Sequence, residues 1–215
     1  MQDTHSSTCS GTGGLLVDCM KGNWADEIDS ITKRLEYMQA AQDETMRLSR
    51  EIVRLCGTCI NSVHCKDMKK AKACLLKCKR MLNKLAKAEP GFEYYSAQAR
   101  QEYVEAYAVY SIASSGKLPA NSEIKEDPRN YIMGLMDVVG ELKREALEAM
   151  RSGDLKAAER HYSMMCSIYD STMHIRFANA LLPGFRKKQD VARIVMESTG
   201  SDLLMAKARA KGTLH

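Results

Sequence analysis

The sequence contains little of the material from which β-sheets are built. Its 215 residues include three phenylalanines, one tryptophan and four prolines, and Val, Ile and Thr form few runs. Ala, Leu, Met, Lys, Glu and Arg, which favour helix, are abundant instead. A chain of this length can bury one sizeable core or at most two small ones. We therefore expect an all-α protein with a single domain.

Segments that would direct the chain to a membrane are also lacking. No run of about 18 or more apolar residues is present, and the N-terminus does not combine a charged region with an apolar stretch and a cleavage site. We therefore expect a cytoplasmic protein without a membrane partner. The eight cysteines should then be free thiols, because the cytosol is reducing. A zinc or redox site at the C-x-x-C pair Cys56 and Cys59 is the alternative.

Apolar residues recur at helical spacing along most of the chain. Residues 1–22, rich in Ser, Thr and Gly, show no sustained pattern and are expected to form a flexible tail, which leaves 23–215 as the helical domain. The pattern predicts helices over approximately 24–59, 68–85, 94–113, 128–151, 155–181 and 185–204. Long helices with short connections pack as an antiparallel bundle, here of six or seven helices.

Two of the predicted helices carry acidic residues in apolar surroundings. Glu102 and Glu105 lie one turn apart on one helix face, at the start of a stretch that is apolar nearly all round. Asp137 is the only charge in YIMGLMDVVG, and Glu141 follows one turn later. Ionised carboxylates are costly in such settings unless they are paired or bind metal, and oxygen-only ligation favours Mg²⁺ or Mn²⁺. Exposure to solvent and pairing with Arg100 or nearby lysines are the alternatives.

The net charge of +5 is concentrated in the segment 66–87, where nine basic residues stand against a single acid. Phosphate backbones bind such surfaces by counterion release, without sequence preference, and a tyrosine beside them can stack on bases. The candidate nucleic-acid-binding residues are Arg47, Arg50, Arg54, Lys69, Lys70, Lys77, Tyr95 and Arg100. A solvated surface that keeps the protein in solution is the alternative.

Three stretches resemble the translin and translin-associated factor X superfamily. They are EYYSAQARQEYVEAYAVY, YIMGLMDVVGELKREALEAMRSGD and LLPGFRKKQDVARIVMESTGSDL. The resemblance implies a translin-like helical protomer that assembles into a closed, octamer-like shell around RNA. In the factor X type, the E-x-x-E glutamates and the aspartate before Gly-Glu-Leu serve a metal-dependent endoribonuclease. These positions match Glu102, Glu105 and Asp137, with Glu141 as the glutamate of Gly-Glu-Leu.

The segment 114–127 is shorter than the matching loop of eukaryotic factor X, so the chain looks more like prokaryotic, archaeal members that form homo-oligomers. We expect an endoribonuclease that uses Mg²⁺ or Mn²⁺ on single-stranded RNA, with single-stranded DNA as a secondary partner. A non-catalytic translin-type binding protein is the main alternative. A ferritin-like site would need E-x-x-H pairs, and a nucleotide pyrophosphohydrolase would need a later E-x-x-D motif; the sequence has neither in the expected place.

Overall fold

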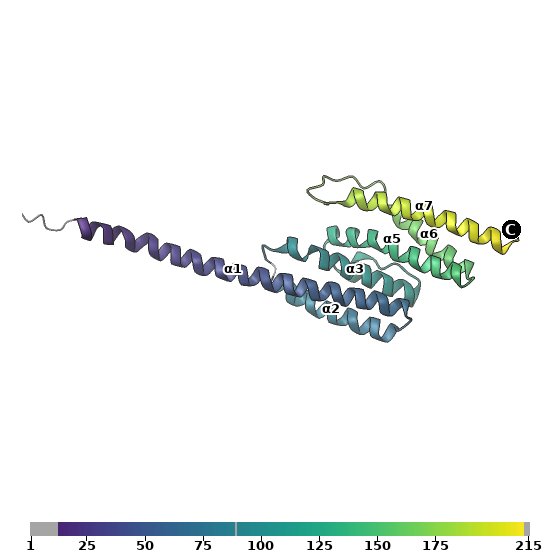
Figure 1. The fold of residues 1–215 in the computed structure, drawn as a ribbon, viewed down its shortest axis with the longest axis horizontal. Coiled ribbons are helices and arrows are strands. Elements are labelled where there is room, and N and C mark those ends of the chain that lie inside the picture. Colours follow the sequence, from purple (N-terminus) through teal and green to yellow (C-terminus); the bar gives the residue numbers. More distant parts are fainter. Residues whose placement is uncertain (1–12, 89, 213–215) are drawn as a thin grey trace, which may run out of the picture. The chain divides into compact units, whose positions relative to one another are not determined.

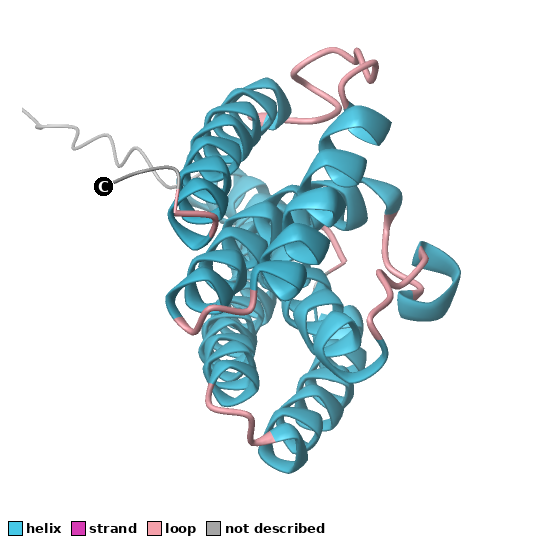
Figure 2. Ribbon diagram, turned by 90° about the vertical axis from the view of Figure 1, so that its right-hand side faces the viewer, coloured by secondary structure: helices cyan, strands magenta, loops and turns pink. Residues whose placement is uncertain are grey.

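The computed structural model describes residues 13–88 and 90–212, and within these ranges all regular structure is helical (Figure 1, Figure 2). The helices are α1 (Gly13–His64), α2 (Met68–Ala88), α3 (Glu93–Ser115), α4 (Asn121–Ile124), α5 (Pro128–Arg151), α6 (Leu155–Thr172) and α7 (Phe185–Ala210). The predicted all-α fold class is confirmed. None of these helices, over the residues described, combines the length and apolarity that crossing a membrane requires.

The predicted signals for helix ends are present at both ends of α5 and at the start of α6. The Asp127 carboxylate accepts a hydrogen bond from the Arg129 amide at 2.9 Å, and Pro128 occupies the first helical position. Gly153, with φ of 79°, follows α5. Asp154 then caps α6 by accepting a hydrogen bond from the Ala157 amide at 2.9 Å.

Other helix boundaries differ from the sequence-based prediction. α1 begins at Gly13, so residues 13–22 of the predicted tail are helical, while residues 1–12 lie outside the described part of the chain. α6 ends at Thr172 instead of near Leu181, and Phe177 and Leu181 in the segment that follows are 60% and 47% exposed. The short helix α4 was not predicted, and α7 continues to Ala210.

The chain divides within α1 into two units, Met1–Glu44 and Thr45–His215. The sequence-based division, a tail over 1–22 and one domain over 23–215, places the boundary elsewhere. The described part of the first unit is helical and exposes a stripe of large apolar side chains at helical spacing. These residues are Trp24, Ile28, Ile31, Leu35 and Met38.

Two clusters of buried apolar side chains form the core of the second unit. One joins α1, α2 and α3, with Ile52, Leu85 and Val104 fully buried or nearly so. The other joins α5, α6 and α7 around Val138 and Met165. α3 lies between α2 and α5, and α5 also packs against α6 and α7 (Figure 1). The interface between α3 and α5 is therefore at the centre of this unit.

A glycine sets the separation of α3 and α5. A Cβ atom added at Gly134 would lie 2.5 Å from the Gln101 carbonyl oxygen and 2.8 Å from the Val104 Cβ, closer than atoms in proteins approach. Only glycine therefore allows the two backbones to come this close without a shift. Gly134 is one turn before Asp137, and Gln101 precedes Glu102, so this close approach occurs where both helices carry acids.

Candidate active site

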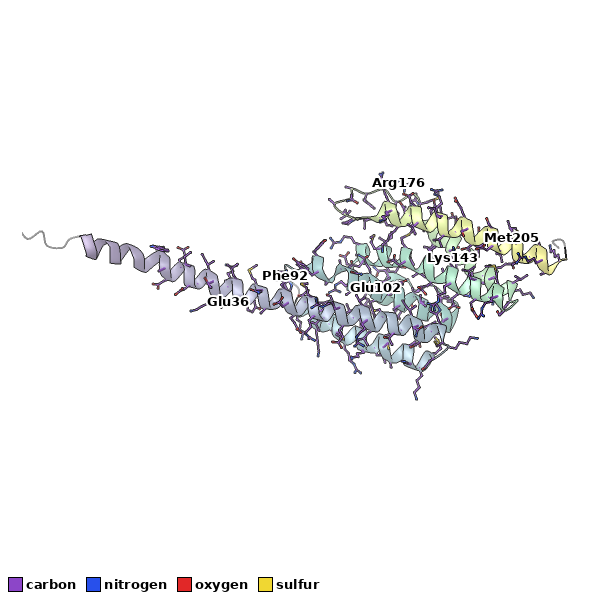
Figure 3. The ribbon with its side chains drawn as sticks, viewed as in Figure 1. Glu36, Phe92, Glu102, Lys143, Arg176 and Met205 are labelled. Carbon is purple, nitrogen blue, oxygen red and sulfur yellow. The ribbon has the colours of Figure 1, made fainter. Side chains whose placement is uncertain are left out.

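Glu102 and Glu105 of α3 and Asp137 of α5 line one cavity of about 540 Å³. Gln98 and Gln101 of α3 and Lys188 of α7 complete its lining. Glu102, labelled in Figure 3, lies midway along α3. The three acids that the sequence singled out on two separate helices thus face the same space.

The acids in this cavity disfavour one another's ionisation. Burial, followed by the negative charges of Asp137, Glu102 and Glu141, raises the pKa of Glu105 to about 8. Burial and the charge of Asp137 also raise the pKa of Glu102, while a hydrogen bond from Gln98 acts in the opposite direction. The cavity therefore holds more negative potential than its surroundings neutralise.

Lys188 supplies positive charge to the cavity from the first turn of α7. Its ammonium Nζ lies 2.5 Å from Asp137 Oδ2 and donates to the Met133 carbonyl oxygen at 3.1 Å, with Gln101 Oε1 at 3.5 Å. The next residue, Gln189, is buried and donates to the Thr172 carbonyl oxygen at 2.7 Å. The first turn of α7 is thereby joined to the last turn of α6.

Glu141, the fourth predicted metal ligand, points toward a different partner. Its Oε2 lies 2.6 Å from Nε2 of His64, the last residue of α1, and the other ring nitrogen of His64 bonds Glu145. Glu141 and Glu145 line a separate, mainly apolar cavity of about 510 Å³ with His161. Glu141 is still near enough to the acid cavity for its charge to raise the pKa of Glu105.

The acid cavity is chemically suited to a hard divalent cation. Its three acids, Glu102, Glu105 and Asp137, offer carboxylate oxygens, which are the ligands that Mg²⁺ and Mn²⁺ prefer. A cation would also relieve the repulsion that raises the pKa of Glu105. The side-chain positions are not those of a closed coordination sphere: among the described residues, no three His, Cys, Asp or Glu side chains gather closely enough to hold a metal. The Lys188 ammonium instead contacts Asp137.

Most of the predicted basic residues lie on the surface of the second unit. Lys69 and Lys70 of α2 and Arg54 of α1 are exposed. Arg47 and Lys77 lie on either side of Glu51, at 3.8 Å and 3.3 Å, and each keeps more than half of its side chain exposed. α1 and α2 therefore present positive charge together.

Arg50 of α1 and Tyr95 of α3 both line a pocket of about 270 Å³. Gln98 lines both this pocket and the acid cavity, so the two spaces adjoin. Ser49 lines the pocket too, and its buried hydroxyl has no hydrogen-bond partner among the described residues. The pocket thus offers a cation, an aromatic ring and a polar group beside the acids.

Arg100 does not share this exposed surface. Its guanidinium donates to Glu126 at 3.0 Å, and the two side chains are 16% and 6% exposed. Asn121 holds the same segment by accepting from the Glu126 amide at 3.2 Å. Arg100 therefore links the α4–α5 connection to α3 and is not part of the exposed basic surface, contrary to the prediction.

The C-x-x-C pair lies inside α1 with both thiols buried. Burial raises the pKa of Cys59 to about 12, and a hydrogen bond with Cys78 together with burial raises the pKa of Cys56. Cys56 and Cys78 are 3.7 Å apart between their sulfurs and belong to the apolar cluster. These thiols behave as small apolar side chains, in agreement with free cysteines rather than a redox pair.

Two contributors to the site were missed in the sequence. Lys188 stands in a basic run, RKK, where nothing in the spacing separates it from its neighbours. His64 was noted only beside the cysteines, although it is 8% exposed and contacts two glutamates. A histidine between two predicted helices gives no sign of which distant acids it will contact.

Comparison with known proteins identifies the group to which the chain belongs. The sequence profile of the Translin family matches residues 26–197. The chain belongs to the translin family. An uncharacterized protein of Methanocaldococcus jannaschii is 36% identical over 187 residues, which cover 83% of this chain and 82% of that protein.

Solved structures of similar proteins have the same fold. The crystal structure of AfC3PO is 34% identical, with a TM-score of 0.79, and the match covers 85% of this chain and 98% of that one. A complex of AfC3PO with duplex RNA matches at 33% identity and a TM-score of 0.78, over 85% and 97% of the two chains. Apo-NeC3PO, at 21% identity and a TM-score of 0.77 over 83% and 96%, shares the fold.

Proposed function

We propose that this translin-family protein binds RNA and cuts it as a divalent-metal-dependent endoribonuclease within a homo-oligomer. The observation that carries the proposal is that Glu102, Glu105 and Asp137 line one cavity. Burial and mutual repulsion make such a group of ionised acids unfavourable unless a cation compensates them. The family model by itself does not distinguish a nuclease from a binding protein, so the acids carry this argument.

Each side chain has a role that follows from its position. Glu102, Glu105 and Asp137 would hold Mg²⁺ or Mn²⁺, with Glu141 near enough to add negative charge. When bound, such an ion supplies a hydroxide-like nucleophile and neutralises charge on the reacting phosphate. Gln98 and Gln101 present amide groups to the same cavity, where they can orient a water molecule or a phosphate oxygen.

The pocket of Arg50 and Tyr95 supports RNA as the substrate. A strand whose phosphate enters the acid cavity can place a neighbouring phosphate against the Arg50 guanidinium and a base against the Tyr95 ring. Exposed Lys69, Lys70 and Arg54 would add sequence-independent affinity. We propose single-stranded RNA as the form that is cut, because an unpaired base can enter such a pocket; single-stranded DNA would bind the same surface.

AfC3PO has a known structure in complex with duplex RNA. A duplex with the same sequence as the single-stranded substrate is therefore the informative competitor in a binding assay. Homo-oligomer formation is supported by the exposed apolar stripe that includes Trp24, Ile28 and Leu35. A closed, octamer-like shell is the assembly we propose. RNA-binding without cleavage remains the alternative function, and the test below separates the two.

The experiment compares Glu102→Gln, Glu105→Gln and Asp137→Asn with the parent on end-labelled single-stranded RNA, in Mg²⁺, in Mn²⁺ and in EDTA. Cleavage by the parent that requires metal and is lost in all three variants, with RNA affinity in EDTA retained, is the expected result. Glu197→Gln is the matched control, because Glu197 is an exposed glutamate of α7 paired with Arg193. Metal-independent cleavage, or full activity in all three variants, would refute a metal-dependent nuclease that uses these acids; binding without any cleavage favours the alternative.

A further inference from the structure

Lys188 is held in the acid cavity more like a bound ion than like a surface lysine. Its ammonium contacts oxygens of three different residues: Asp137 Oδ2 at 2.5 Å, the Met133 carbonyl at 3.1 Å and, at a longer 3.5 Å, Gln101 Oε1. These acceptors come from both α3 and α5, whereas the lysine comes from α7. The side chain is 26% exposed, so most of it lies within the protein.

The electrostatic effect of Lys188 reaches all three acids. Its positive charge lowers the pKa of both Glu102 and Glu105, opposing the increase caused by burial and by neighbouring carboxylates. The ammonium therefore performs, in part, the neutralisation expected of a metal. It contacts Oδ2 of Asp137, and both residues line the cavity.

We propose that the Lys188 ammonium is an internal counterion of the acid cavity, which a divalent cation displaces from Asp137 when it binds. The inference rests on the proposed function, because it takes Asp137 as a metal ligand. A cation at bonding distance from a carboxylate oxygen would lie within a few ångströms of the ammonium, where two positive charges repel strongly. Lys188 must then leave its three acceptors.

The exchange has two opposite effects on the protein. Without metal, Lys188 stabilises the fold, since it compensates acids that would otherwise repel one another. With metal, the same lysine lowers affinity, because its contacts with Asp137, Met133 and Gln101 must first be broken. A lysine that was only structural would produce the first effect and not the second.

Lys188→Met separates these possibilities, since methionine has a similar length and apolar stem but no charge. Lys187→Met is the matched control: it removes the same charge from the neighbouring, exposed position, which does not line the cavity. The full-length proteins are titrated with Mn²⁺ by calorimetry in the absence of RNA, and their melting temperatures are measured in EDTA and in Mn²⁺ at one protomer concentration. Lys188→Gln provides the same loss of charge if the methionine variant does not fold.

We expect Lys188→Met to bind Mn²⁺ about tenfold more tightly than the parent, as follows from removing a unit charge beside a divalent ion. Its melting temperature in EDTA should be lower than that of the parent, and its rise on adding Mn²⁺ should be larger. Lys187→Met should match the parent in both measurements.

Unchanged or weaker Mn²⁺ affinity in Lys188→Met, with the parent binding Mn²⁺ normally, overturns the displacement and leaves the proposed nuclease standing. Mn²⁺ binding by neither protein overturns both. An equal increase of Mn²⁺ affinity in Lys188→Met and Lys187→Met would show a general effect of net charge. This result would also overturn the role of Lys188.

Discussion

Removing one negative charge from the acid cavity should have opposite effects on stability at two of its positions. Glu105→Gln and Asp137→Asn each neutralise one carboxylate lining the same cavity. Glu105 is surrounded by acids, which together with burial raise its pKa to about 8. Asp137 is paired with Lys188 at 2.5 Å. In EDTA the first variant should therefore be more stable than the parent and the second less stable.

The size of the first effect follows from the pKa of Glu105. The folded protein holds this proton more tightly than the unfolded chain, whose value is near 4.5, so the parent loses stability as pH rises from about 4.5 to about 8. Each tenfold change in proton affinity corresponds to about 1.4 kcal/mol, so ionisation of Glu105 can lower the free energy of unfolding by at most about 5 kcal/mol. Solvent in the open cavity reduces this loss. We therefore expect the free energy of unfolding of Glu105→Gln to exceed that of the parent by about 1–2 kcal/mol near pH 8 and by almost nothing near pH 4.5.

The second effect has the opposite sign and a different cause. Asp137→Asn leaves the Lys188 ammonium without its carboxylate, and the two side chains are 37% and 26% exposed. Partial exposure limits the loss to about 1 kcal/mol, well below the cost of stranding a fully buried charge. The assay is urea denaturation of each variant at several pH values in EDTA, at one protomer concentration. The account would be refuted if the free energy of unfolding changed in the same direction in both variants. It would also be refuted if the added stability of Glu105→Gln did not increase with pH.

Three further predictions concern binding, packing and assembly. Affinity for single-stranded RNA should fall steeply with salt, and Lys70→Gln should reduce the logarithmic salt slope by about 0.7, measured by fluorescence anisotropy; an unchanged slope would remove Lys70 from the interface. Gly134→Ala should cost about 1–3 kcal/mol in denaturation, because its Cβ would meet Gln101 and Val104, whereas Gly140→Ala, whose Cβ meets nothing within 4 Å, should be neutral or stabilising. Light scattering should give a particle much larger than the 24.1 kDa protomer, and Ile28→Glu in the exposed stripe should reduce it; a monomeric parent would contradict this.

The sequence predicted helices well where apolar periodicity was reinforced by caps. Asp127-Pro128 and Gly153-Asp154 mark the ends of α5 and the start of α6 as expected. The predicted extension of α6 to near Leu181 was wrong, because apolar residues beyond Thr172 were read as a continuation of the helix, which ends at Thr172. The start of α1 was missed because the residues before Asn23 have no apolar pattern of their own.

For the site, the sequence indicated which acids were unusual but not what they contact. Glu102, Glu105 and Asp137 stood out because their neighbours are apolar, and they line one cavity. Whether they line the same cavity depends on how α3 and α5 pack, and a single amino-acid sequence does not specify this packing. The partners Lys188 and His64 come from helices distant in sequence, and their contacts arise only from tertiary structure.

The hydrogen bond from Gln189 to the Thr172 carbonyl gives the α6–α7 connection an influence on the acid cavity. Gln189 and Lys188 are consecutive residues of one helical turn, so a rotation of α7 that broke this bond would also turn the ammonium away from Asp137. The connection is itself held at its end, where the Gly184 amide donates to Asn179 at 3.0 Å. An insertion or deletion in this connection would therefore change the electrostatic potential around the three acids without altering any of them.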